Sequence, residues 1–125
     1  MKTLSIIVAI ILILHGLIHL MGTVTYMKIG TVQGLTYKTT LLGGRRDLGE
    51  SGIAVYGALW AAAAIGFVIA AIAMLFGWDW WKPVLTGVTI FSLALTALDW
   101  EVASAGAILN VVILAWLWLA PNIGK

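Results

Sequence analysis

The sequence contains no cysteine and few charged residues. The lack of cysteine excludes disulfides, thiolate metal sites and cysteine nucleophiles. Charged residues make up 10% of the chain, whereas a soluble domain carries about 25%. The net charge is only +2, and no run of basic residues offers a site for nucleic acid. Because 62% of the residues are apolar, the composition indicates a single membrane domain, residues 1–125, whose main partner is the lipid bilayer.

Four apolar segments are long enough, or nearly so, to cross a bilayer as helices, which takes about 20 mostly apolar residues. No cleavage site of small residues follows the first segment, so we expect it to be a retained span rather than a signal peptide. The sequence therefore predicts an all-α membrane protein, an up-down bundle of four transmembrane helices. The expected spans are 4–24, 53–76, 83–98 and 102–120.

One connection between the predicted spans is long. The other two are tight turns, at 77–83 and 99–101. Residues 25–52 join the first two spans, are rich in Thr and Gly, and hold four of the seven basic residues. Two β-prone stretches within this loop, 25–29 and 35–39, favour a short hairpin. The alternative is a path along the lipid headgroups.

An even number of crossings places both termini on one side of the membrane. Basic residues stand on both sides, at Lys2, Lys82 and Lys125 with the termini and at Lys28, Lys38, Arg45 and Arg46 opposite. This distribution gives no clear charge bias. Because the first helix often dominates orientation, a lysine beside the amino terminus favours cytoplasmic termini in the cell membrane.

Small residues recur along the second predicted span, at Ala58, Ala62, Gly66 and Ala70. Intervals of four place them on one helical face, where a small side chain lets two helices approach closely. Such a face suits a homo-oligomer or a larger membrane complex. Small residues serve equally for packing between helices of one bundle and for contact between protein chains. We favour packing inside the bundle.

Polar residues also follow one face of the third predicted span. A polar stripe is expected to turn away from lipid, where it would line a hydrated path. Alternatively, Ser and Thr hydroxyls bond back to their own helix or across to a neighbour. The stripe consists of Thr86, Thr89, Ser92, Thr96 and Asp99.

The first predicted span carries two histidines, His15 and His19. Four residues apart on a helix, they share one face and can bind one metal ion together. An ionisable residue inside a membrane is a functional candidate by default. The alternative for His15 is a neutral imidazole bonded to Asn110 in the fourth span or to a Thr hydroxyl, and Asn110 itself suits a structural bond between helices.

Four of the five acidic residues are expected at the same end of the bundle as the histidines, namely Asp47, Glu50, Asp99 and Glu101. Imidazole and carboxylate together suit zinc, iron or manganese. A divalent metal is therefore one expectation, with His15, His19 and Asp99 as its ligands. Histidine titrates near neutral pH, so a proton relay through the same residues is a second expectation.

The acids also allow purely structural interpretations. Asp47 and Glu50 have the spacing of a capping box at the start of the second helix. Asp99 and Glu101 suit a solvated turn, in which an acid near a helix N-terminus is favourable. The candidates for a polar cavity are therefore His15, His19, Asp99, Glu101 and Asn110, followed by Asp47, Glu50 and Thr96.

The stretch from His15 to Gly22, with the pattern HGxxHxxG, resembles the first helix of uncharacterised small bacterial four-helix membrane proteins. Leu48–Glu50, Tyr56–Trp60 and Ile108–Ile113 fit the same resemblance, and the overall shape is similar to that of DoxX-like proteins. The resemblance implies four helices and no particular activity.

Two classes of function remain from the sequence. The first is a non-enzymatic accessory subunit or small-molecule handling module. The second is a metal- or proton-dependent membrane enzyme or carrier that uses His15, His19 and Asp99. No nucleophile–base pair, phosphate-binding loop or nucleotide motif points to a more specific reaction.

Overall fold

The computed structural model describes residues 2–119, apart from the side chain of Lys2. Within that range the chain forms four helices, each long and apolar enough to cross a membrane. This confirms the predicted all-α bundle. The helices are α1 (Lys2–Tyr26), α2 (Gly49–Leu75), α3 (Trp81–Leu98) and α4 (Trp100–Leu119).

All four helices begin earlier than the predicted spans. The largest difference is in α2, which begins at Gly49 rather than 53 and ends at Leu75 rather than 76. Hydropathy marks only the apolar part of a helix, whereas the backbone hydrogen bonds continue into the polar boundary of the membrane. The predicted end of the last span, residue 120, lies outside the described residues.

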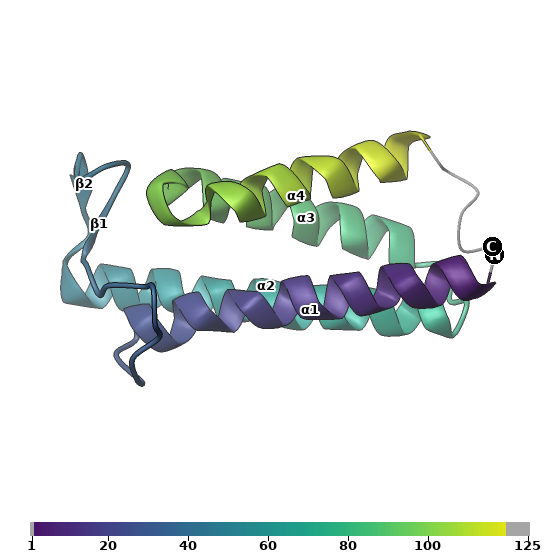
Figure 1. Cartoon of the computed structure of the whole chain (residues 1–125), viewed down its shortest axis with the longest axis horizontal. Helices are drawn as coiled ribbons and strands as arrows, with labels where there is room; N and C mark the ends of the chain where they lie inside the picture. Colours follow the sequence, from purple (N-terminus) through teal and green to yellow (C-terminus); the bar gives the residue numbers. More distant parts are fainter. Residues whose placement is uncertain (1, 120–125) are drawn as a thin grey trace.

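The helices run up and down, so that α1 begins and α4 ends at the same end of the bundle (Figure 1). Helix α2 contacts both α1 and α3, and α3 contacts α4. Helices α1 and α4 face each other on one side of the bundle, and their backbones lie further apart than those of the neighbouring pairs. The long loop between α1 and α2 lies at the other end, beside the start of α4.

Two glycines of the HGxxHxxG stretch bring α1 close to α2. A Cβ atom at Gly16 would lie 2.9 Å from Cβ of Phe67 and 3.1 Å from the carbonyl oxygen of Ala64. A Cβ atom at Gly22 would lie 3.0 Å from the indole ring of Trp60. A larger residue at Gly16 would push α1 and α2 apart, and one at Gly22 would press on the Trp60 ring, so the two glycines allow one face of α1 to pack closely against α2.

The row of small residues on α2 is divided between two environments. Ala70 is buried and Gly66 contacts Val88 of α3, whereas Ala58 and Ala62 face outward. The predicted packing inside the bundle therefore holds only for the half of the row nearer the termini.

We expect Gly66→Leu to destabilise the bundle by more than about 1 kcal/mol, as other overpacking substitutions do. A Cβ atom at Gly66 would lie 2.5 Å from Cγ2 of Val88, so α2 and α3 would have to separate. Thermal unfolding in detergent measures the effect. Gly87→Leu is the matched control, because nothing lies within 4 Å of a Cβ atom there. Equal melting of both variants would contradict the contact.

The long loop contains a short antiparallel hairpin of β1 (Thr40–Leu41) and β2 (Arg46–Asp47). The predicted strands at 25–29 and 35–39 are wrong. The first begins inside α1, and the chain turns later, at Gly43 and Gly44, whose φ angles of +67° and +89° favour glycine. The hairpin is attached to the bundle by a hydrogen bond of 3.0 Å from the amide of Leu42 to the carbonyl of Leu98.

The buried apolar side chains form two clusters along the bundle axis. One lies toward the termini and includes Phe67, Trp81 and Leu85. The other lies toward the loop and includes Ile53 and Leu95. The buried polar groups gather in the loop half of the bundle, beside these clusters, and they form the candidate site.

Candidate functional site

One stripe of α1 supplies most of the site. His15, His19, Gly22 and Tyr26 are separated by steps of four, three and four residues, so they share one helical face. His15 is 5% exposed and His19 1% exposed. The predicted shared face of the two histidines is therefore directed into the bundle, and their rings lie 4.8 Å apart.

The two histidines belong to a hydrogen-bonded network that joins three helices. His15 Nε2 lies 2.8 Å from Oδ1 of Asn110, and Nδ2 of Asn110 donates to the hydroxyls of Ser92 at 2.8 Å and Thr96 at 3.3 Å. Nε2 of His19 lies 2.6 Å from the Ser92 hydroxyl, and Nδ1 of His19 lies 2.7 Å from the carbonyl oxygen of His15.

One assignment of donors is consistent with all of these hydrogen bonds. A carbonyl only accepts, so His19 donates from Nδ1 and accepts the Ser92 proton at Nε2, while His15 donates from Nε2 to Asn110. Both imidazoles are then neutral, and the chain of bonds closes on the backbone of His15. The arrangement matches the structural alternative for His15 and Asn110, because unpaired polar groups are costly where water is absent.

The other hydroxyls of α3 bond within their own helix. Thr86, Thr89 and Thr96 donate to the carbonyls four residues earlier, at distances of 2.6 to 2.9 Å. The predicted polar stripe is therefore mostly self-satisfied rather than a hydrated path. Ser92 is the exception, since its hydroxyl turns toward α1.

A second polar cluster centres on Asp99, the residue between α3 and α4. Asp99 as a whole residue is 3% exposed, so the predicted solvated turn is wrong at this position. The Tyr26 hydroxyl donates to Oδ2 of Asp99, and Nζ of Lys38 in the loop lies 2.7 Å from Oδ1. Asp99 therefore ties α1 and the long loop to the end of α3.

The remaining acids do not enter the site. Glu101 faces outward, as a solvated turn residue does, and Glu50 is exposed and pairs with Lys28 at 3.6 Å. Asp47 is also exposed, and the residue that caps α2 is Leu48. Leu48 makes no capping hydrogen bond with its side chain, so the predicted capping box of Asp47 and Glu50 is wrong.

Asp47 nevertheless accepts one of the unpaired amides at the start of α2. Its Oδ1 lies 2.9 Å from the amide nitrogen of Gly49. This bond stabilises the charged carboxylate and is the main reason why the pKa of Asp47 lies below its usual range. A hydrogen bond from the Thr39 side chain lowers the pKa further. The role of Asp47 is local and structural.

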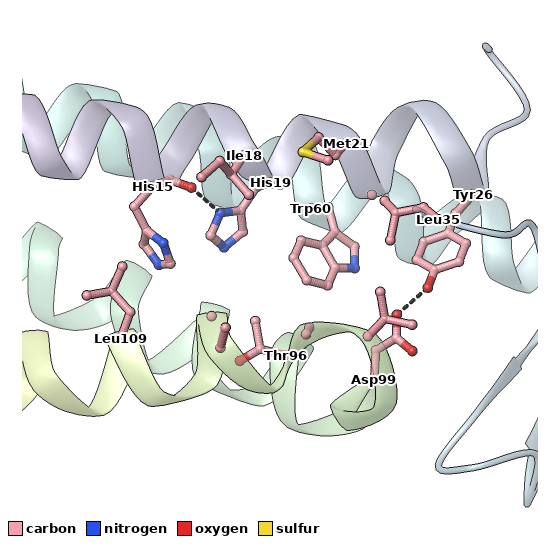
Figure 2. A pocket seen from close by; sticks show the side chains of 15 residues that line it. His15, Ile18, His19, Met21, Tyr26, Leu35, Trp60, Thr96, Asp99 and Leu109 are labelled. Atoms are coloured by element: carbon pink, nitrogen blue, oxygen red, sulfur yellow. Dashed lines mark hydrogen bonds between the residues drawn. The ribbon is translucent and has the colours of Figure 1, made fainter. Parts of the chain in front are cut away.

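A cavity of about 300 Å³ lies between α1 and α4 in the loop half of the bundle (Figure 2). His15 and His19 line one end, and Tyr26 and Asp99 line the other. Asn110, which is hydrogen-bonded to His15, is fully buried and does not line the cavity. The remaining wall residues are Ile18, Met21, Gly22, Leu35, Trp60, Thr96, Val102, Ala103, Ala105, Gly106 and Leu109.

The sequence of α4 explains why the cavity exists. Ala103, Ala105 and Gly106 of α4 line the cavity with small side chains or none, which leaves space between the helices. Ala103 also departs from helical geometry, with φ −113° and ψ 17°. Ile18, Met21 and Val102 belong both to the cavity wall and to the outward-facing surface. The cavity therefore opens sideways, between α1 and α4, in the direction of the lipid.

Among residues 2–119, no three His, Cys, Asp or Glu side chains come together in a way that could hold a metal ion. Nε2 of each histidine is engaged in the network, and Asp99 is engaged by Tyr26 and Lys38. The predicted metal site at His15, His19 and Asp99 is therefore not formed in this part of the chain.

Four residues that bring polar side-chain atoms to the site were not among the sequence candidates: Tyr26, Lys38, Trp60 and Ser92. Tyr26 lies on the same face of α1 as the histidines, and Ser92 belongs to the polar stripe of α3. Helical periodicity in the sequence therefore indicates both residues. No such pattern indicates Lys38, because its place depends on the path of the loop.

The chain matches no protein-family model, and no curated protein or solved structure shows significant similarity to it. The roles of its residues therefore rest on the geometry described above. The resemblance to small bacterial four-helix membrane proteins stays a prediction.

Proposed function

We propose that this protein is a small-molecule handling module that binds a membrane-dissolved molecule in the cavity between α1 and α4. The observation that supports this most is the cavity itself, with about 300 Å³ of space, mainly apolar walls and an outward-facing rim. Its volume is at the lower end of the range for small-molecule sites, and such sites combine apolar walls with a few polar groups.

The hydrogen bonds favour a binding role over a proton-dependent one. A relay from the histidines to Asp99 needs a continuous chain of donors and acceptors. In the described residues, the network of His15 and His19 closes on itself, and the bonds of Asp99 lead to Tyr26 and Lys38 instead. The two polar clusters therefore stay in place at the two ends of the cavity, where they orient a bound molecule.

We expect Ala105→Trp to block the cavity, because Ala105 lies in its wall and at its rim. A small apolar diazirine, activated by light in lipid nanodiscs, should label the half-buried cavity residue Leu109 in the unmodified protein. Most of that labelling, mapped by mass spectrometry, should disappear in Ala105→Trp.

Ala62→Trp is the matched control, since Ala62 faces outward on α2 away from the cavity. Labelling of Leu109 should be unchanged in this variant. Labelling of the outward-facing Ile65 should be unchanged in Ala105→Trp, which would show that the probe still reaches the protein. Undiminished labelling of Leu109 in Ala105→Trp would refute binding in the cavity.

We also propose that the protein lies in the cell membrane with cytoplasmic termini, on the basis of the lysine beside the amino terminus. The chain has no native cysteine, so Thr3→Cys and Thr40→Cys can each be tested with a membrane-impermeant thiol reagent on intact cells. Labelling at 40 and protection at 3 are expected, and the reverse pattern would overturn the orientation. Assembly into a homo-oligomer or a larger complex, as an accessory subunit, stays a prediction.

A further inference from the structure

We propose that the molecule bound in the cavity is a lipophilic alcohol or phenol whose hydroxyl group donates a hydrogen bond to Nδ1 of His15. This inference rests on the proposed function and names the ligand class for the same site. It is carried by an acceptor in the cavity wall that no described residue bonds.

Nδ1 of His15 is an accessible nitrogen without a hydrogen-bond partner. Among the described residues, the His15 ring makes one hydrogen bond, from Nε2 to Asn110. His19 differs, because its Nδ1 bonds the carbonyl four residues earlier and its Nε2 bonds Ser92. Only two side-chain polar atoms in this part of the chain are both covered and unpartnered, and Nδ1 of His15 is not one of them. It therefore keeps accessible surface, although His15 as a whole is only 5% exposed.

The accessible part of the His15 ring belongs to the cavity wall. Figure 2 shows the imidazole projecting from α1 into the space between α1 and α4. The rings of His19 and Phe67 pack against it edge to face, each with a centroid distance of 4.8 Å. Asn110 holds Nε2 at 2.8 Å. These contacts fix the orientation of the ring, so Nδ1 does not turn toward another group of the chain.

The hydrogen bonds around Asn110 make Nδ1 of His15 an acceptor. The amide nitrogen of Asn110 donates to Ser92 and Thr96. Its oxygen therefore faces His15, whose proton lies on Nε2. The reverse orientation of the amide fails, because its oxygen would then need a proton from Ser92 or Thr96. Those protons are already donated, to Nε2 of His19 and to the backbone of α3. Nδ1 of a neutral His15 thus carries a free lone pair.

The free lone pair favours a bound molecule that brings a donor, because a buried polar group without a partner is costly. A carbonyl, ether or carboxylate offers only lone pairs, which the lone pair of His15 repels. An ammonium group offers protons, but its charge would be buried without a counter-charge, since Asp99 in the cavity wall is already paired with Lys38. A hydroxyl is neutral and brings one proton for one lone pair. The ligand class is therefore alcohols and phenols with an apolar body.

The bilayer and water are poorer partners for this nitrogen. Lipid tails are as apolar as leucine and carry no donor. A water molecule occupies about 30 Å³ and needs roughly two to four polar partners. The cavity has about 300 Å³, and Ile18 and Leu109, which share its wall with His15, are apolar. A hydroxyl group on a larger apolar molecule both fills this space and bonds the nitrogen.

The test compares 4-ethylphenol with 4-ethyltoluene, which differ only in a hydroxyl against a methyl group. The chain has two histidines, so the protein is labelled with ¹⁵N in both imidazoles, placed in lipid nanodiscs and titrated with each compound. We expect 4-ethylphenol to move the His15 Nδ1 resonance to lower frequency, as an accepted hydrogen bond does, and 4-ethyltoluene to leave it in place. His19 is the internal control and should not respond, because both of its nitrogens are already bonded.

The affinity for 4-ethylphenol is expected to exceed that for 4-ethyltoluene about tenfold, which corresponds to 1.4 kcal/mol. Both affinities are expressed relative to the concentration dissolved in the bilayer, so that differences in partitioning cancel. His15→Phe keeps a ring but removes the acceptor, and should reduce the ratio to about one. Leu14→Phe, at an outward-facing position of the same helix outside the cavity wall, is the matched control and should keep the ratio. If His15→Phe does not fold, the His15 resonance of the unmodified protein decides the question.

The outcomes separate this inference from the proposed function. If both compounds bind equally and are both blocked by Ala105→Trp, the cavity is a binding site but the hydroxyl inference is overturned. A proton on Nδ1 of His15 in the unliganded protein would also overturn it, as would an Nδ1 resonance that ignores 4-ethylphenol. Tighter binding of 4′-methylacetophenone, which offers an acceptor and no donor, would do the same. If none of the compounds binds, the proposed function fails as well.

Discussion

Asn110→Ala is expected to destabilise the bundle by roughly 2–3 kcal/mol, because it removes hydrogen bonds to three other buried side chains at once. His15 Nε2 would lose its acceptor, and the hydroxyls of Ser92 and Thr96 would lose a donor. Asn110 is fully buried, so water from a membrane surface cannot replace these bonds. Thermal or SDS-induced unfolding of the protein in detergent micelles measures the loss.

Two further variants determine whether the effect comes from the network. Ile108→Ala changes an outward-facing residue of the same helix and should alter stability by less than about 0.5 kcal/mol. Ser92→Ala removes another member of the network, so the double variant with Asn110→Ala should cost less than the sum of the single variants. Strict additivity would mean that Asn110 and Ser92 act independently.

Hydropathy predicts the four crossings because each helix must satisfy its own backbone and present apolar side chains to lipid. The same physics predicts that His15 cannot stay unpaired, and Asn110 is one of few groups deep enough to meet it. Sequence alone does not select Ser92 over its neighbours in the stripe. That choice depends on how α3 is rotated against α1, which close packing at Gly16 and Gly66 helps to determine.

Residue types alone predict a metal site, and geometry explains why none forms among the described residues. Helical spacing brings His15 and His19 together, but each nitrogen that faces a neighbouring helix is already bonded there. Asp99 lies at the other end of the same cavity, where Lys38 neutralises its charge. A pattern of ligand types therefore does not show whether their lone pairs are free.

The loop was the least predictable part of the chain. Its hairpin depends on Gly43 and Gly44, whose positive φ angles close the turn, rather than on the β-prone residues before it. The contact of Lys38 with Asp99 joins residues that are 61 positions apart. No local pattern indicates such a pairing, because it follows from the way the loop folds back over the end of the bundle.

Asp99→Ala is expected to destabilise the protein by roughly 3 kcal/mol, because it leaves Lys38 and the Tyr26 hydroxyl without their acceptor in a mostly buried site. The loop would also lose its charged attachment to the end of α3. We therefore expect faster tryptic cleavage at Arg45 and Arg46, which are exposed on the hairpin. Unfolding in detergent and limited proteolysis measure the two effects separately.

The matched control is Glu101→Ala, which removes an acid from the same turn at an outward-facing position and should leave both readouts nearly unchanged. Lys38→Met should have a smaller effect on unfolding than Asp99→Ala, about 1 kcal/mol, because the side chain of Lys38 is 26% exposed and that of Asp99 only 2%. The loss of the buried acceptor, rather than of the ion pair alone, then accounts for most of the cost. If Glu101→Ala and Asp99→Ala prove equally mild, Asp99 does not hold the loop against the bundle, and the polar end of the cavity is open to solvent.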